Sequence, residues 1–417
     1  MGRALQALAR GQSMKTRIAE IQEALRQARL DGWLFYDFRL SDPIAYRVLQ
    51  LSEHGATTRR WFCFVPSSGS VRTLVSTVES HRLDSIGAEQ IIYRSYPQMI
   101  EGLRSILGSA RRIAMNYSPR AAIPYVSRVD AGTIELVRSL NVEIVTSADL
   151  VQRFEARLTA DQLAGHRRAG AGLGRVVDET FAEIARQVRA GQAPTEFEIQ
   201  QFMMDRFAAA GLTTNEPPIV AVNAHSADPH FGPTRENTSP IRKGDFVLLD
   251  LWAKEKTRDA AYADITWTGY VGESVPEEHA RIFEIVARAR DAAVDLVKRR
   301  IEDGATIHGH EADRAARAVI EQAGFGDAFV HRTGHSIGRE VHGMGANLDS
   351  LETEDNRTLI EGTCFSVEPG IYLQGKFGVR SELDMTIENG RAEVTAPDPQ
   401  REVVPILARS RYELLSL

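Results

Sequence analysis

The feature that most constrains the fold of this sequence is a set of four acids and one histidine, each in a strand-like or glycine-punctuated stretch of its second half. They are Asp250, Asp264, His335, Glu368 and Glu382. Carboxylates flanked by apolar strand residues are costly to bury alone, and an uncompensated one takes up a proton rather than stay charged. A fold that buries all four acids must therefore bring them together around positive charge.

Two divalent cations would supply that charge. They carry about four positive units, which balances four carboxylates, and His335 would add a neutral nitrogen donor. Such a ligand set is typical of a two-metal hydrolase, in which a water molecule becomes a strong nucleophile near neutral pH.

Each residue taken alone also suits a structural role. Asp250 and Glu368 could cap turns at strand ends, Glu382 could pair with Arg380, and His335 could be a core histidine. Glycines on both sides of His335 argue against a helical histidine pair there and favour close backbone approach in a packed cleft. The ordered occurrence of all five favours the metal site.

The motifs around these residues resemble those of the pita-bread metallopeptidases. That family includes aminopeptidase P, Xaa-Pro dipeptidase (prolidase), methionine aminopeptidase and the metal-free creatinase. The resemblance covers roughly residues 155–400 and rests on two spaced aspartates followed by Thr-x-Thr, and on segments 331–342, 367–372 and 378–382. Any one motif is weak, but four in the same order are specific.

The resemblance implies a role for each ligand. Asp250 and Asp264 would hold one metal, with Asp264 bridging. His335 and Glu368 would complete the other metal, and Glu382 would bridge both. Manganese is the expected metal, with cobalt or zinc as alternatives.

The resemblance also implies residues that act on the substrate. His230, His331 and His342 match positions that hydrogen-bond the scissile carbonyl and relay a proton to the leaving nitrogen. Arg380 would lie near Glu382 and support it. His225 and His310 match no family position and are interpreted as incidental.

The length and the pattern of elements predict two domains. A chain of 417 residues is long for one domain. Residues 1–155 alternate helical and strand signals, which predicts an α/β domain with a mixed sheet, resembling the creatinase N-terminal domain. Residues 156–417 are expected to form the α+β pita-bread catalytic domain. Capping boxes at Thr159 and Thr195 open its first two helices.

Composition excludes several other classes of protein. A net charge of −6 does not favour binding to nucleic acid or to an anionic membrane. No apolar run is long enough to cross a bilayer. The two cysteines, Cys63 and Cys364, are expected to be buried and reduced in a cytoplasmic protein. The N-terminus lacks a signal-peptide pattern, and Met14 is an alternative start. The resemblance implies a homodimer.

The expected substrates are short peptides with proline in the second position. The Xaa-Pro bond has no N–H, and the proline ring fixes the backbone angle, so ordinary peptidases handle it poorly. The expected activity is that of an Xaa-Pro dipeptidase, with aminopeptidase P or a creatinase-like C–N hydrolase as alternatives. A dipeptidase needs a cation for the free proline carboxylate, and Arg357 is only an approximate match for it.

Overall fold

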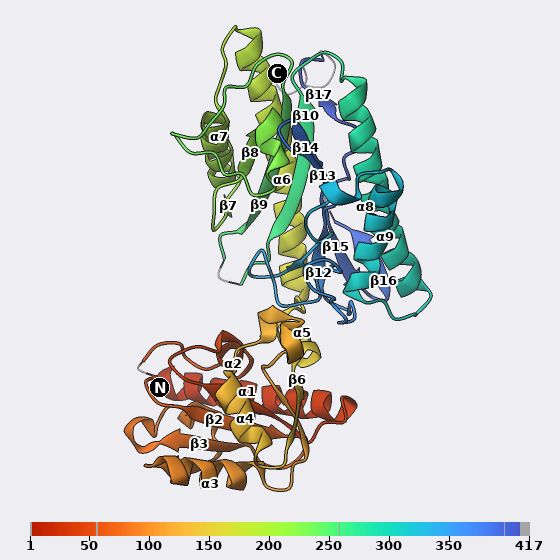
Figure 1. Cartoon of the computed structure of the whole chain (residues 1–417). Helices are drawn as coiled ribbons and strands as arrows, with labels where there is room; N and C mark the ends of the chain where they lie inside the picture. The colour runs from red at the N-terminus through yellow and green to blue at the C-terminus, as the bar shows by residue number, and fades with distance from the viewer. Residues whose placement is uncertain (1, 56, 258, 396, 409–417) are drawn as a thin grey trace. The chain divides into compact units, whose positions relative to one another are not determined.

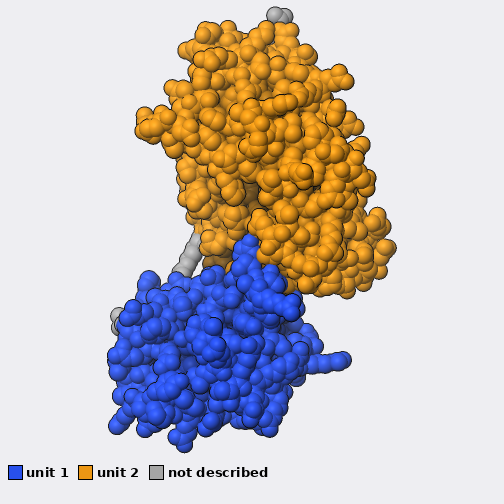
Figure 2. All heavy atoms as spheres, viewed as in Figure 1, with its two compact units in different colours: residues 1–155 blue, residues 156–417 orange. Residues whose placement is uncertain are grey.

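The computed structural model describes residues 2–55, 57–257, 259–395 and 397–408. The chain divides into two compact units, residues 1–155 and 156–417 (Figure 2). Figure 1 shows the elements of each unit in order along the chain.

A six-stranded mixed sheet forms the centre of the first unit. Its spatial order is β4-β3-β2-β1-β5-β6. The strands are β1 (Gly32–Asp37), β2 (Trp61–Pro66), β3 (Arg72–Ser76), β4 (Glu89–Tyr93), β5 (Arg112–Met115) and β6 (Glu143–Thr146). β2 pairs antiparallel with β1 and with β3, whereas the other neighbours run parallel. Both edges therefore end in parallel pairs, as a sheet built through helical crossovers requires.

Helices surround this sheet. They are α1 (Gly2–Gln27), α2 (Pro43–Val48), α3 (Tyr96–Leu107), α4 (Ala131–Arg138) and α5 (Ala148–Glu155). The inner face of α3 contributes Met99, Leu103 and Ile106 to a core that also contains Phe62 and Leu74 of the sheet. Apolar burial of this kind, about 25 cal/mol per Å², holds the helices on the sheet.

Two acids are fully buried where β1 leads into α2. Asp42 caps α2 by accepting from the Ala45 N–H (3.1 Å), and it also accepts from the Asn116 amide (2.6 Å). Asp37 accepts from the Asp42 N–H (3.0 Å) and from the Tyr46 hydroxyl (2.7 Å). These bonds fix the turn between strand and helix.

Because Asp42 is buried in this turn, we expect the stability of the fold to depend on pH. Burial raises the pKa of Asp42 to about 7, whereas an unfolded aspartate titrates near about 3.9. Because the pKa of Asp42 is higher in the folded protein than in the unfolded protein, its contribution to stability is fully present below the unfolded-state pKa. That contribution is lost as the pH rises toward the folded-state pKa. We expect the Tm of the wild type to fall relative to that of Asp42→Asn between pH 4 and 7 in scanning calorimetry. A Tm difference that stays constant over this range would contradict the expectation.

The second unit begins with two helices that start at capping boxes, as the sequence predicts. Helix α6 (Ala160–Arg189) starts after Thr159 and α7 (Glu196–Ala209) after Thr195, and in each box the side chains of the cap and of the third helical residue bond reciprocally. Two further helices, α8 (Glu277–Glu302) and α9 (Gly309–Gln322), pack against each other. Their apolar faces belong to a core shared with Phe365 and Met385.

The strands of the second unit form three sheets. One contains β7 (Leu212–Thr213), β8 (Ile219–Val222), β9 (Phe246–Glu255), β10 (Ala263–Tyr270) and β17 (Val404–Pro405). Another contains β11 (Ser336–Ile337), β12 (Cys364–Val367), β15 (Leu383–Glu388) and β16 (Arg391–Val394). The third is the hairpin of β13 (Gly370–Leu373) and β14 (Phe377–Arg380). Helix α6 packs on β9 and β10, and α8 packs on β16 and β14 (Figure 1).

Several observations bear on the sequence-based expectations. The strand β4 and the short helix α2 were not predicted. Both cysteines are buried and unpaired. Within the described ranges, no helix combines the length and apolarity needed to cross a bilayer.

Candidate metal centre

A long hairpin carries the two aspartates. β9 and β10 pair antiparallel with Asp250 opposite Thr266 and Trp252 opposite Asp264. Residues directly opposite lie on the same face, and side chains alternate along a strand, so Asp250, Thr266 and Asp264 share one face. Both aspartates are buried.

The histidine and the first glutamate come from the neighbouring sheet. His335 immediately precedes β11, and Glu368 immediately follows β12. Ser366 joins them, because its hydroxyl accepts from the His335 N–H (3.0 Å) and donates to Glu368 Oε1 (3.1 Å). His335 Nε2 lies 3.3 Å from Glu368 Oε1 and 3.6 Å from Asp264 Oδ2.

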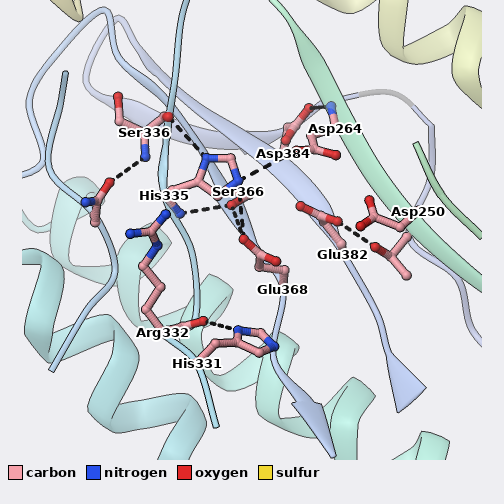
Figure 3. A network of polar contacts seen from close by, with 12 residues as sticks. Asp250, Asp264, His331, Arg332, His335, Ser336, Ser366, Glu368, Glu382 and Asp384 are labelled. Atoms are coloured by element: carbon pink, nitrogen blue, oxygen red, sulfur yellow. Dashed lines mark hydrogen bonds and ion pairs between the residues drawn. The ribbon is translucent and has the colours of Figure 1, made fainter. Parts of the chain in front are cut away.

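The second glutamate completes a compact group. Glu382 lies between β14 and β15, and its Oε2 accepts from the Thr266 hydroxyl (2.6 Å). One ligand atom each from Asp264, His335 and Glu382 lies within 4.8 Å of the others. Figure 3 shows these side chains with Glu368 and Asp250 around one space. The structure thus gathers all five residues.

The carboxylates of this group raise one another's pKa values, and a bound cation would stabilise their charged forms. Burial, and then repulsion from Asp250 and Asp384, raises the pKa of Asp264 well above its usual value. Burial also raises the pKa of Glu382 well above its usual value, with Asp264 and Glu368 adding to the effect. The pKa of Glu368 rises to about 7, mainly through burial. Burial holds the pKa of His335 well below its usual value, which leaves a neutral nitrogen donor.

The donor atoms themselves fit metal binding. Asp264 Oδ1 is buried and has no hydrogen-bond partner among the described residues. A buried carboxylate oxygen without a hydrogen-bond donor is rare in a native structure, and such an oxygen suits a metal ligand. Carboxylate oxygens with one imidazole nitrogen are a suitable set for manganese, cobalt or zinc.

Arg380 lies near enough to Glu382 for their charges to interact, but its direct ion pair is with another acid. Its guanidinium pairs with Asp250, and its Nε donates to the Thr266 hydroxyl (3.0 Å). The closest approach to Glu368 is 4.0 Å. Arg380 is therefore primarily the counter-ion of Asp250, because the end of β14 brings it across the hairpin face.

Arg380 also begins a chain of hydrogen bonds that ends at His331. One guanidinium nitrogen donates to the Tyr372 hydroxyl (3.0 Å), which lies 2.7 Å from His331 Nε2. His331 Nδ1 donates to the Arg332 carbonyl (2.7 Å), so Nε2 accepts from Tyr372. Burial lowers the pKa of His331 to about 3, so its ring is neutral.

The other two histidines have open positions at the site. His342 is exposed, and its ring stands edge-on to His335 with centroids 4.4 Å apart. His230 is exposed in the loop after β8, and Arg380 donates to the carbonyl of the preceding Pro229 (3.3 Å). Both can therefore meet a bound molecule.

Two residues at the site were not predicted from the sequence. Asp384 is buried, and its Oδ2 accepts from the Asp264 N–H (2.8 Å). Its position two residues after Glu382 is a signal that could have found it, since alternate residues of a strand share a face. Tyr372 lies in the segment 367–372 used for the resemblance, but no role was assigned to it.

Comparison with known proteins gives a consistent result. The chain matches metallopeptidase family M24 over residues 165–389, more than half of its length. It is 31% identical to the Xaa-Pro dipeptidase of Lactobacillus helveticus over 224 residues, which span 52% of each chain. It is 30% identical to the probable dipeptidase PepE of Mycobacterium tuberculosis over 66% of this chain and 67% of that one.

Two solved structures share the fold over nearly the whole chain. Dipeptidase PepE from Mycobacterium ulcerans superimposes with a TM-score of 0.68 at 24% identity, covering 94% of this chain and 98% of that one. An Xaa-Pro dipeptidase from Bacillus anthracis superimposes with a TM-score of 0.60 at 22% identity, covering 94% and 99%.

Proposed function

The chain belongs to metallopeptidase family M24, and we propose that it hydrolyses the Xaa-Pro bond of dipeptides and other short peptides. The observation that carries the proposal is the convergence of three buried acids, a partly buried fourth and a neutral histidine at one point of the second unit. Its relatives named Xaa-Pro dipeptidase and dipeptidase support the substrate class.

The proposed ligands are those gathered by the two sheets: Asp250, Asp264, His335, Glu368 and Glu382. Two divalent ions held there would polarise the scissile carbonyl and supply a strong nucleophile from water at neutral pH. Asp384 holds the backbone of Asp264 in place, and Ser366 joins His335 to Glu368. Such outer contacts orient ligands and typically matter about 10–100-fold for metal affinity or activity.

The proposed residues on the substrate side are His230 and His342. Each would hydrogen-bond the carbonyl oxygen or pass a proton to the proline nitrogen. We propose that His331 acts through Tyr372, because its Nε2 already accepts from that hydroxyl. Arg380 would favour the charged form of Asp250, whose pKa burial raises, and would orient the Tyr372 hydroxyl.

Metal exchange and substrate length test the proposal together. Protein stripped of metal should not cleave Ala-Pro, and refilling with manganese, cobalt or zinc should restore turnover. On the dipeptidase proposal, Ala-Pro is cleaved at least as fast as Ala-Pro-Ala at matched concentration. Much faster cleavage of the tripeptide would replace the dipeptidase assignment by aminopeptidase P.

The structure removes Arg357 as the cation for a free proline carboxylate. This arginine is buried, and its guanidinium donates twice to Asp355 (2.9 and 2.6 Å) and once to the Met344 carbonyl (2.9 Å). A guanidinium bound in this way stabilises its own loop and has few donors left for a substrate.

Arg332 is the better candidate for that cation. Figure 3 shows its side chain among those of the centre, and its charge contributes to lowering the pKa of His335, after burial and His342. We expect Arg332→Met to weaken Ala-Pro binding about tenfold or more, because a charged hydrogen bond is lost. The KM of Ala-Pro amide, which has no carboxylate, should change little. Arg332→Lys serves as the charge-preserving control, and equal effects on the two substrates would contradict the role.

The remaining parts of the proposal concern metal, assembly and location. We propose manganese as the native metal, a homodimer in solution and a cytoplasmic location. The two buried, unpaired cysteines suit a reducing compartment. Metal analysis of protein purified without added metal and light scattering test the first two.

A further inference from the structure

We infer that Glu196 and His225 fix the loop that carries His230, and so act as positioning residues for hydrolysis. The inference rests on the proposed function for the role of His230 at the substrate. The attachment of the loop itself is independent of that role.

Glu196 is the first residue of α7, yet its side chain does not cap its own helix. The capping box of α7 uses Thr195 and Glu198. The carboxylate of Glu196 is fully buried and accepts from the Val222 N–H (2.7 Å) and the Ser239 N–H (2.6 Å). One buried carboxylate therefore binds the residue before and the residue after segment 223–238.

The start of α7 strengthens the second of these attachments. The Glu196 N–H donates to the Ser239 carbonyl (3.0 Å), and the Phe197 N–H donates to the Thr238 hydroxyl (3.0 Å). Both are N–H groups of the first helical turn, which have no partner inside the helix. The loop thus ends on the N-terminus of a helix.

His225 connects this carboxylate to the residues around His230. Its Nδ1 lies 2.9 and 3.0 Å from the two oxygens of Glu196. Its ring stacks on Phe231, the neighbour of His230, with centroids 4.1 Å apart and planes at 25°. The imidazole therefore bridges a fixed, buried acid and the part of the loop that presents His230.

The same loop is attached to the metal centre on another side. The Gly378 N–H in β14 donates to the Ser226 hydroxyl (2.8 Å). A Cβ on Gly378 would lie 2.0 Å from the Ser226 carbonyl oxygen, so only glycine allows the two backbones to approach this closely. With the bond from Arg380 to Pro229, these contacts define where His230 stands relative to Asp250 and Glu382.

The electrostatics agree with a structural use of this acid. Burial raises the pKa of Glu196, while the bonds from Ser239, His225 and Val222 act in the opposite direction. Removing a donor leaves a buried carboxylate less satisfied, which is costly. The loop and the carboxylate therefore depend on each other.

The first test replaces His225. We expect His225→Ala to lower kcat about 10- to 100-fold, the scale of a small misplacement of a reacting group, with unchanged metal content and a smaller change in KM. Amide hydrogen exchange in segment 222–239 should become faster. His225→Gln keeps a donor for Glu196 and should restore most of the rate. His81→Ala, at an exposed position of the first unit, is the control and should leave rate and exchange unchanged.

The second test is a double-mutant cycle with His230. If His225 acts through His230, adding His225→Ala to His230→Ala should cost no further activity. Additive losses, unchanged exchange in His225→Ala or full activity of His230→Ala would each overturn the inference. If the metal-loaded wild type does not cleave Ala-Pro, the proposed function fails, whereas the exchange measurement still decides whether the loop is attached through His225.

Discussion

Replacing Glu382 by alanine is expected to abolish hydrolysis of Xaa-Pro peptides while the fold survives. One ligand atom of Glu382 lies within 4.8 Å of those of Asp264 and His335, so its removal takes a ligand atom from this group. Metal analysis should show loss of bound ions, and activity on Ala-Pro should fall to the level of the metal-stripped wild type. Circular dichroism should remain that of the wild type, because Glu382 makes few contacts outside the centre.

Although Glu382 is expected to be needed for activity, its charge is expected to destabilise the metal-free protein. The pKa of Glu382 is raised by burial and by neighbouring acids, so its charged form costs stability at neutral pH. We expect Glu382→Gln to raise the Tm of metal-free protein and to reduce the gain in Tm on adding metal. Glu388→Gln, at the end of the strand β15 that follows Glu382 but paired with Arg167, is the matched control. Full turnover by metal-free wild type would contradict the metal centre itself.

The parts of the fold that the sequence predicted are those set by local patterns. Both capping boxes start helices where Thr159 and Thr195 indicated. The apolar strands of the first unit form a mixed sheet as expected. β4 was missed because it is an edge strand whose residues 89, 90 and 92 are exposed, so no buried pattern marks it.

The candidate site could be predicted as a set of residues but not as a set of contacts. The order of the acids and the histidine indicated that they converge, and the structure gathers them around one space. Their assignment as metal ligands stays a prediction. The pairing of Arg380 with Asp250 joins residues 130 positions apart, and no local pattern specifies such a pair. Likewise, the hydrogen bond of His225 with Glu196, which lies 29 residues earlier, could not be predicted from a local pattern.

The same limit explains Arg357. In the sequence, Arg357 follows an acidic stretch and was an approximate match for the cation that binds the proline carboxylate. The structure instead buries it on Asp355, two residues away. Breaking a buried ion pair costs about 3–5 kcal/mol, so this arginine contributes mainly to the stability of its loop. On the dipeptidase proposal, another residue must bind the free carboxylate.

His230→Ala and His342→Ala are expected to keep their metal and lose most of their activity. Neither side chain lies in the compact group formed by Asp264, His335 and Glu382, and both are exposed, as groups that meet a substrate must be. Loss of one donor to a developing oxyanion typically lowers kcat about 10²–10³-fold. The measurement is kcat on Ala-Pro together with metal content for each variant.

The comparison with His331 makes this prediction specific. Its two ring nitrogens are already used by the Arg332 carbonyl and the Tyr372 hydroxyl, so His331→Ala should act by releasing Tyr372. In that case Tyr372→Phe should reproduce much of its loss, whereas Tyr372→Phe should add to the loss in His230→Ala or His342→Ala. Loss of metal from His230→Ala or His342→Ala would refute their placement at the substrate, because a residue that only contacts the peptide cannot change the metal content.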